Sequence, residues 1–303
     1  MKYFYDTEFI EGTQNQLFGR KSLPTIDLIS IGIVSEDNRE YYAISKDFNL
    51  KDAWNRYDLK IETASGDQRN IFPNGITHKV YWIRENVLRP IFRELRAREV
   101  VESNDNLSRP FDKRVDYPTY EFDYKSFDRL IKKYGKSNKQ IADEIKLFTH
   151  TATLDQLEYK GIKDKMHIYQ FKYTDIKWEV SDHYSKEGSL KEIINQTDAE
   201  NPENVELYGY YSAYDHVVLC WLFGKMIDLP KGFPMYTFDL QQESDRKFNL
   251  YKERYYETIC FGKSFIHDIT ETPGYPKSSN VHNALDDAKW TKQFHYFLEN
   301  LSV

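Results

Sequence analysis

The stretch Lys2–Phe9 places two carboxylates inside a run of aromatic residues that favours a β-strand. Side chains alternate between the faces of a strand, so Asp6 and Glu8 project from one face and Thr7 from the other. Two neighbouring buried carboxylates repel each other, and a hard divalent cation is one partner that neutralises both. Ion pairs with Lys or Arg at a strand end are the alternative, and this stretch alone does not separate the two.

Composition narrows the class of protein. A chain of 303 residues predicts one α/β domain, residues 1–303, that carries insertions. An aromatic content of 16% excludes a wholly disordered chain, and the lack of a long apolar run excludes a transmembrane span. Cys220 and Cys260 have no metal-ligand spacing, and no signal segment precedes the first strand. We therefore expect a soluble, cytoplasmic protein with no membrane partner.

The net charge of −6 argues against a protein that holds long duplex DNA by electrostatic attraction. It does not exclude a nuclease, because an acidic metal site loses its negative charge only when its ions bind. Enzymes that act on nucleic acid therefore stay open.

The order of apolar runs predicts a three-stranded meander at the start of the chain. Thr25–Val34 is nearly continuous in apolar character, as in a strand buried on both faces, and a turn leads to a third strand at Glu40–Ile44. Residues 11–25 are interpreted as a long hairpin loop, and residues 46–80 as polar and irregular.

Two core helices are predicted next, at residues 83–95 and 141–148. Pro90 is expected to kink the first helix, and Ser137 or Asn138 to cap the second. The arginine row of the first helix faces either solvent or phosphates; its members are Arg84, Arg89, Arg93 and Arg96. Regions of about 97–136 and 151–203 are predicted insertions, the second with a strand-like stretch at Met166–Phe171.

In the stretch Val205–Leu219 a predicted strand runs through small residues into an apolar helix, and Asp215 stands at the junction. The crevice where strands end and helices begin is the usual place for ligands in an open α/β sheet. An ordinary helix cap is the alternative for this residue. His216 beside it is interpreted as a packed histidine.

The terminal helix carries an acid on its core-facing stripe. Spacings of three and four residues put Asp287 on that stripe and turn Asp286 away from it; the other members are Ala284, Ala288, Thr291, Phe294 and Leu298. His282 precedes the helix, where its ring can turn back toward Asp287.

These motifs together resemble a known family. Asp-x-Glu-Phe on the first strand, an aromatic-Asp pair at a strand-to-helix junction and a late His-x-Ala-x-x-Asp are similar to those of DEDDh 3′-5′ exonucleases. The five matching positions are Asp6, Glu8, Asp215, His282 and Asp287.

The motif surroundings resemble those of bacterial polyadenylate-specific exoribonucleases more narrowly. The resemblance rests on Tyr-Phe-Tyr-Asp-Thr-Glu-Phe-Ile-Glu, Leu-Ile-Ser-Ile-Gly-Ile-Val, Ala-Tyr-Asp-His-Val and Val-His-Asn-Ala-Leu-Asp-Asp-Ala. It covers residues 1–45, 82–95, 138–148 and 205–300, and leaves both insertions unexplained. One departure is Tyr211, where the wider superfamily often carries Asn.

The resemblance implies a ribonuclease H-like mixed sheet with antiparallel first three strands and flanking helices. It also implies that four carboxylates hold two Mg²⁺ or Mn²⁺ ions, with His282 as general base. Single-stranded RNA is the implied substrate, with a possible preference for A-rich 3′ ends, and a homodimer the implied assembly. Thr7, Phe9 and Tyr214 are the candidate substrate contacts, although both aromatic residues could be core residues instead. A DNA-directed exonuclease and a catalytically inactive nucleic-acid-binding module are the other interpretations.

Overall fold

The computed structural model describes residues 1–14, 23–62, 76–105, 122–149, 157–163, 166–171, 177–181, 205–258, 269–277 and 282–301. The chain divides into two compact units. The first consists of Met1–Phe9, Leu28–Ser45 and Lys136–Val303, and the second of Ile10–Asp27 and Lys46–Gly135. The expected single domain with two insertions stays a prediction. In the described ranges, no helix is long and apolar enough to cross a membrane.

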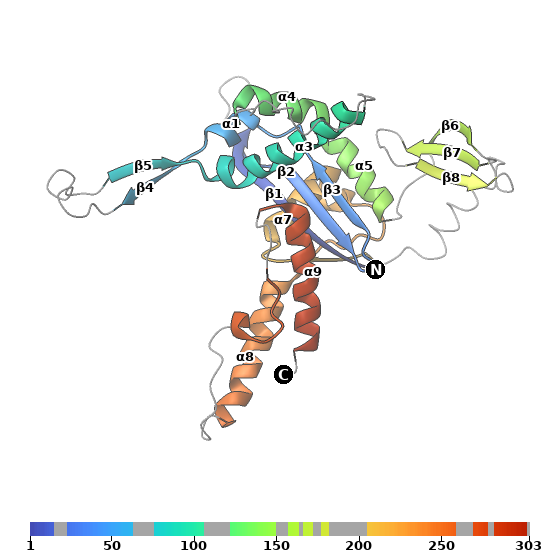
Figure 1. The fold of residues 1–303 in the computed structure, drawn as a ribbon. Helices are drawn as coiled ribbons and strands as arrows, with labels where there is room; N and C mark the ends of the chain where they lie inside the picture. Colours follow the sequence, from blue (N-terminus) through green and yellow to red (C-terminus); the bar gives the residue numbers. More distant parts are fainter. Residues whose placement is uncertain are drawn as a thin grey trace. The chain divides into compact units, whose positions relative to one another are not determined.

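A mixed five-stranded sheet forms the centre of the first unit, in the order β10-β9-β1-β2-β3. Figure 1 labels β1, β2 and β3 of this sheet. β9 pairs in parallel with β1 and β10, and β2 pairs antiparallel with β3. The strands are β1 (Lys2–Gln14), β2 (Leu23–Ser35), β3 (Glu40–Ile44), β9 (Glu206–Gly209) and β10 (Phe238–Asp239). The predicted meander strands are confirmed. The predicted hairpin loop at 11–25 is too long, because β1 continues to Gln14 and β2 starts at Leu23.

Four helices of the first unit are described: α5 (Asn138–Phe148), α7 (Ala213–Phe223), α8 (Leu240–Thr258) and α9 (Ala284–Asn300). Ser137 caps α5, since its hydroxyl accepts a hydrogen bond from the Gln140 N–H at 3.2 Å. The predicted apolar stripe of α9 is buried, with Ala284, Ala288 and Thr291 toward its start and Phe294 and Leu298 toward its end. Short 3₁₀ turns lie at Met226–Asp228 and Ile269–Glu271.

The region predicted as a second insertion contains a small antiparallel sheet, β6 (Leu157–Lys163), β7 (Met166–Phe171) and β8 (Lys177–Ser181). Only β7 was expected from the sequence.

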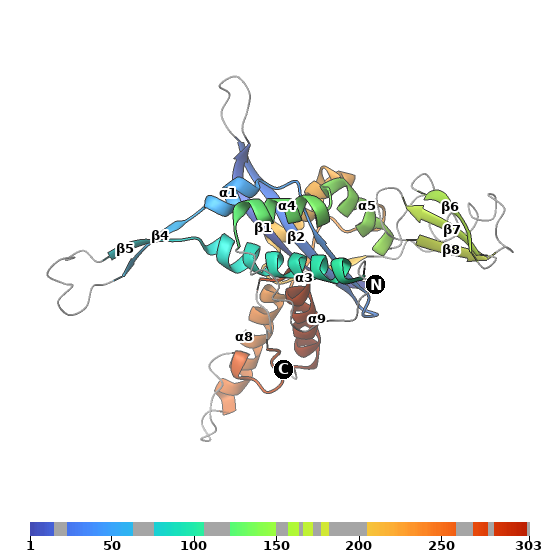
Figure 2. The same cartoon turned by 45° about the horizontal axis from the view of Figure 1, so that its top comes forward.

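The second unit is richer in regular structure than its polar sequence predicts. Residues 46–80, predicted to be irregular, contain α1 (Leu50–Asn55) and the antiparallel pair β4 (Asp58–Glu62) and β5 (Ile76–Val80). The expected insertion at 97–136 contains the end of α3 (Arg89–Asp105) and all of α4 (Tyr124–Tyr134). Figure 2 shows α3 and α4 side by side, and Arg129 of α4 pairs with Glu99 of α3.

A π-helix, η2 (Arg84–Leu88), runs directly into α3. The Arg89 N–H donates to the carbonyl of Arg84, five residues back. Pro90 has no N–H, and its ring crowds the carbonyl four residues earlier, so a widened turn just before it relieves the clash. The kink expected at Pro90 therefore takes the form of a π turn.

Candidate active site

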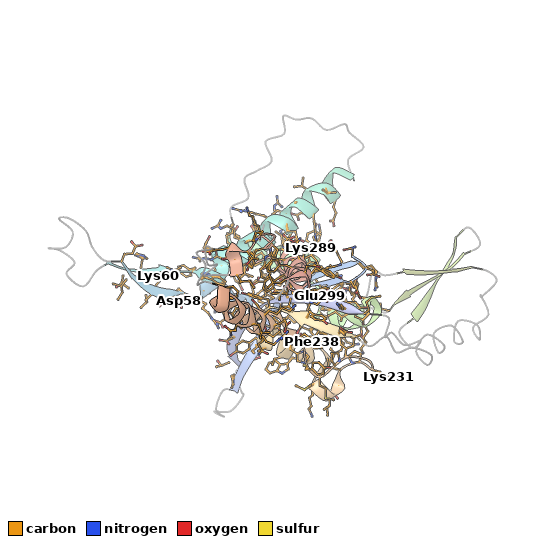
Figure 3. The ribbon with its side chains drawn as sticks, turned by 90° about the horizontal axis from the view of Figure 1, so that it is seen from below. Asp58, Lys60, Lys231, Phe238, Lys289 and Glu299 are labelled. Atoms are coloured by element: carbon orange, nitrogen blue, oxygen red, sulfur yellow. The ribbon has the colours of Figure 1, made fainter. Side chains whose placement is uncertain are left out.

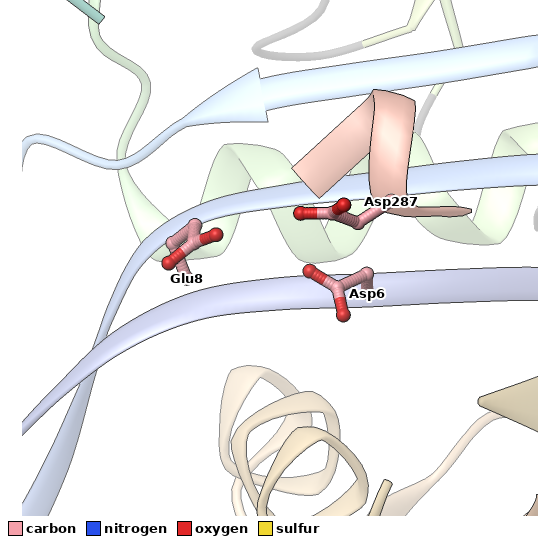
Figure 4. Close-up of side chains that lie close together, drawn as sticks. All are labelled: Asp6, Glu8 and Asp287. Atoms are coloured by element: carbon pink, nitrogen blue, oxygen red, sulfur yellow. The ribbon is translucent and has the colours of Figure 1, made fainter. Parts of the chain in front are cut away.

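Three carboxylates converge in the first unit (Figure 4). Asp6 and Glu8 come from β1 and Asp287 from the first turn of α9, and one oxygen of each lies within 4.8 Å of the others. Asp6 and Glu8 share a face of β1, as strand alternation requires. Residues about 280 positions apart in the chain thus form one acidic cluster.

A glycine brings α9 close enough to the sheet. A Cβ atom on Gly32 of β2 would lie only 2.3 Å from the carbonyl oxygen of Ala284 and from the nitrogen of Leu285. Any larger residue would push away the first turn of α9, which carries Asp287. Close contact between Gly32 and the helix start therefore sets the position of this acid.

The lead-in to α9 also orients Asp287. The Asn283 side chain caps the helix by accepting hydrogen bonds from the N–H groups of Leu285 and Asp286. His282 adopts a φ of 71°, and its N–H donates to Asp287 Oδ2 at 2.9 Å. The left-handed conformation of His282 thus turns a backbone donor toward the acid.

Asp215 is not part of the three-carboxylate group, but it is tied to the residue between Asp6 and Glu8. Its Oδ1 accepts hydrogen bonds from the Thr7 N–H at 2.9 Å and the Thr7 hydroxyl at 2.5 Å. Asp215 lies in the first turn of α7, whose N-cap residue is Ser212. The interpretation of Asp215 as an ordinary helix cap is therefore wrong.

The four acids carry unbalanced negative charge. Burial is the main cause that raises the pKa of Asp6 well above its ordinary value, with repulsion by Asp215, Glu8 and Asp287 adding to it. Burial and the charges of Asp287 and Asp215 raise the pKa of Glu8 to about 8. Burial raises the pKa of Asp287 and that of Asp215 to about 6, and the Thr7 hydrogen bonds oppose the shift at Asp215.

This donor set fits a divalent metal ion. No Lys or Arg of the described ranges forms an ion pair with Asp6, Glu8 or Asp287, so the alternative of acids neutralised by side-chain cations finds no support there. Carboxylate oxygens are the ligands that Mg²⁺ and Mn²⁺ favour, and a bound cation would relieve the repulsion that raises the pKa values.

His282 and two aromatic residues lie on the same segments as the acids. His282 is half-buried, and burial lowers the pKa of its imidazole, which favours the neutral form that accepts a proton. Phe9 and Tyr214 pack together with ring centroids 5.6 Å apart, and Tyr214 is 50% exposed. Such exposure favours a surface role over the core alternative for Tyr214. Thr7 is buried with its hydroxyl on Asp215, which favours a positioning role over substrate contact.

The turn between β9 and α7 has a backbone conformation at Tyr211 that suits the Asn often found there in the wider superfamily. Tyr211 has a φ of 53°, the left-handed region in which Asn is enriched and a bulky residue is strained. The turn is tight, since a Cβ on Gly209 would lie 2.4 Å from the Ser212 Cβ.

Gly32 and Asn283 also position the acids, and sequence reasoning missed both. His216 is buried, as expected.

Comparison with known proteins finds similarity over part of the chain. Residues 171–298 match the 3′-5′ exoribonuclease Rv2179c-like domain. A segment of 49 residues is 55% identical to 3′-5′ exoribonuclease Rv2179c of Mycobacterium tuberculosis, covering 16% of this chain and 23% of that relative. A 3′-5′ exoribonuclease from a second strain of the same species matches to the same extent. The matched segment thus spans about a quarter of the relatives' length. Both relatives are named as 3′-5′ exoribonucleases.

Proposed function

We propose that this chain is a metal-dependent 3′-5′ exoribonuclease that releases 5′-mononucleotides from single-stranded RNA. The observation that carries the proposal is the convergence of Asp6, Glu8 and Asp287, with Asp215 tied to the residue between the first two. The family match supports the reaction class, and it includes the segments that contain Asp215, His282 and Asp287.

The four acids would hold two Mg²⁺ or Mn²⁺ ions. Asp6 is the acid repelled by all three others, so it is the best candidate for a ligand shared between two cations. Such a pair of ions supplies an activated water and charge stabilisation at the leaving oxygen of the phosphodiester. Thr7 holds Asp215 through two hydrogen bonds and so fixes where this carboxylate points.

His282 would act as the general base. Its imidazole, kept neutral by burial, accepts the proton of the attacking water at a ring nitrogen. The hydrogen bond from the His282 N–H to Asp287 keeps the backbone of His282 beside this acid.

Phe9 and Tyr214 are the candidate platform for the terminal base. Aromatic rings bind single strands by stacking without reading their sequence. A stacked duplex end would first have to be unpaired, at a cost of a few kcal/mol, so we expect the enzyme to act on unpaired 3′ ends. A preference for A-rich ends and a homodimer rest on the resemblance to polyadenylate-specific exoribonucleases, and a cytoplasmic location rests on the cysteine pattern and the lack of a signal-like segment. Light scattering at micromolar concentration tests the dimer.

Degradation of 5′-labelled single-stranded RNA homopolymers, beside matched DNA and duplex substrates, tests the proposal. We expect products that shorten by one nucleotide at a time from the 3′ end, faster for RNA than for DNA. Early internal cuts or a requirement for a 5′ end would overturn exonuclease polarity. Faster loss of DNA would favour the DNA-directed alternative, and binding without any hydrolysis would favour the inactive module.

A further inference from the structure

The β4–β5 ribbon of the second unit has two chemically different faces. Figures 1 and 2 show the ribbon as a separate pair of strands. In its register Leu59 lies opposite Lys79 and Ile61 opposite Thr77, so these four side chains share one face. Both carboxylates of β4 lie on the other face, where Glu62 pairs with His78. Figure 3 marks Asp58 and Lys60, two residues of this acid-bearing face.

The acid-free face is exposed. Leu59 is 64% exposed and Ile61 68%, and all five residues of β4 are exposed. A two-stranded ribbon without further strands is marginally stable in water. Neighbouring exposed apolar side chains on a folded protein are a candidate binding surface.

Aromatic rings and cations continue this face beyond the strand ends. Tyr57, 43% exposed, packs against Tyr81 with ring centroids 5.7 Å apart. Lys79 Nζ lies 4.1 Å from the centroid of the Tyr57 ring, and Arg84 Cζ lies 3.7 Å from that of Tyr81. Lys79 and Arg84 thus make cation–π contacts with Tyr57 and Tyr81. Both carboxylates of β4 lie on the other face of the ribbon.

The π turn of η2 extends the cationic row along the helix. Because its hydrogen bond spans five residues, Arg84 and Arg89 stand about one turn apart, and Arg93 follows Arg89 by four residues in α3. Glu85 contacts both Arg84 and Arg89 and holds them in place. Arg93 is exposed and forms no ion pair with a described residue. We call Tyr57, Leu59, Lys79, Tyr81, Arg84, Arg89 and Arg93 the ribbon surface.

We propose that the ribbon surface binds the single-stranded RNA substrate at a site separate from the carboxylate cluster. The choice of RNA rests on the proposed exoribonuclease function. Charge complementarity supports it: among the described residues, Glu85 is the one carboxylate that pairs with any of Lys79, Arg84, Arg89 and Arg93, in a chain of net charge −6. Phosphates bind such cations, and bases stack on exposed rings such as Tyr57. Exposed Leu59 and Ile61 also suit a protein partner, and the experiment below distinguishes RNA binding from protein binding.

Fluorescence anisotropy of labelled single-stranded RNA of about 30 and about 4 nucleotides, in excess chelator and over a range of salt, tests this. The variants are Lys79→Gln and the double variant Lys79→Gln/Arg93→Gln. The matched control is Lys60→Gln, which removes the same charge from the other face of the same ribbon. Each single-strand phosphate contact contributes about 0.7 to the slope of log K against log salt.

We expect the double variant to raise the Kd of the 30-mer about tenfold and to flatten its salt slope by about 1.4, with Lys79→Gln intermediate. The Kd of the 30-mer divided by the Kd of the 4-mer should rise from the wild type to Lys79→Gln and again to the double variant. Lys60→Gln should match the wild type. Equal Kd values for all four proteins, or equal loss with Lys60→Gln, would overturn the proposal. A change of oligomeric state in light scattering with unchanged RNA binding would assign the surface to a second copy of the chain. Because the binding assay needs no hydrolysis, a failed ladder assay would refute the proposed function separately.

Discussion

The buried Glu144 and the partly buried acids Asp6 and Glu8 of the first unit have opposite surroundings. Glu144 of α5 is 1% exposed, and it accepts hydrogen bonds from Lys136 Nζ at 2.7 Å, Gln140 Nε2 at 3.0 Å and Tyr41 Oη at 2.9 Å. Asp6 and Glu8 lie beside Asp287 and form no ion pair with a cation among the described residues. Burial and like charge raise the pKa of Glu8 to about 8.

This difference in hydrogen-bond and charge partners distinguishes an acid that stabilises the fold from an acid that can bind a metal ion. A buried charge with a full set of partners is part of the packing, whereas a partly buried cluster of one sign costs folding free energy until an ion binds. Variants at the two places should therefore act in opposite ways on activity and stability.

The largest expected effect is on hydrolysis by Glu8→Gln. Metal-based charge stabilisation is worth several kcal/mol, and each 1.36 kcal/mol is a factor of ten, so we expect a loss of about 10³-fold or more in kcat. Glu144→Gln should keep activity within about twofold, because Glu144 has no part in the site. Steady-state release of nucleotides from labelled RNA measures both. Equal losses would erase the distinction between the two groups.

The His282→Ala variant tests whether His282 acts as a general base and not as a metal ligand like the acids. Loss of a positioned general base should lower kcat by about 10² to 10⁴ while Mn²⁺ binding stays close to that of the wild type. The wild-type rate should rise with pH through the lowered pKa of His282, and the variant should lose that limb. Calorimetric titration of Mn²⁺ and a pH–rate profile provide the readouts. Collapse of metal binding would make His282 a ligand or a structural residue.

Glu144→Ala tests the structural side. Removal of this partner leaves the Lys136 ammonium, the Tyr41 hydroxyl and the Gln140 amide without their shared acceptor. We expect a loss of about 3 kcal/mol in the free energy of unfolding, the usual cost of breaking a buried pair. Urea unfolding in excess chelator measures it. A loss below about 1 kcal/mol would show that Glu144 is not held as tightly as its contacts indicate.

The smallest expected effect is a pH dependence of the metal-free protein. The pKa of Glu8 in the folded state is about 8, and those of Asp215 and Asp287 are about 6, all above their ordinary values. The folded state therefore binds more protons than the unfolded state between about pH 4 and pH 8, so stability falls as pH rises through this window. We expect a measurable fall in the free energy of unfolding, smaller in Glu8→Gln than in the wild type. Stability that rises across the window would contradict the like-charge account.

Much of the fold could be predicted because its core elements carry periodic apolar patterns. β2 is a continuous apolar run, and α9 has a stripe that ends in Phe294 and Leu298. The missed elements lack such patterns or hide them. All residues of β4 are exposed, so no core-facing alternation marks this strand. Phe127, Leu130 and Ile131 of α4 do have helical spacing after the capping Asp123, but Tyr-rich and Pro-rich neighbours masked it.

The candidate site was predictable in its residue types but not in its supports. Strand alternation alone puts Asp6 and Glu8 on one face, and the resemblance adds Asp215, Asp287 and His282. The hydrogen bonds from Thr7 to Asp215 join residues 208 positions apart, and no local pattern indicates them. The contact of Gly32 with the start of α9 is equally long-range. Such supports depend on tertiary packing, which a single sequence does not show.

The central claim is that the carboxylate cluster stores repulsion that a bound cation relieves. Thermal unfolding of the wild type and Glu8→Gln at pH 8, in chelator and across a Mn²⁺ titration, tests it most directly. The account predicts a higher Tm for metal-free Glu8→Gln than for metal-free wild type. It also predicts a wild-type Tm that rises with Mn²⁺, equivalent to about 2.7 kcal/mol at 100 times Kd, and a much smaller rise in the variant. A metal-free variant less stable than the wild type, with equal Mn²⁺ responses in both, would contradict the claim.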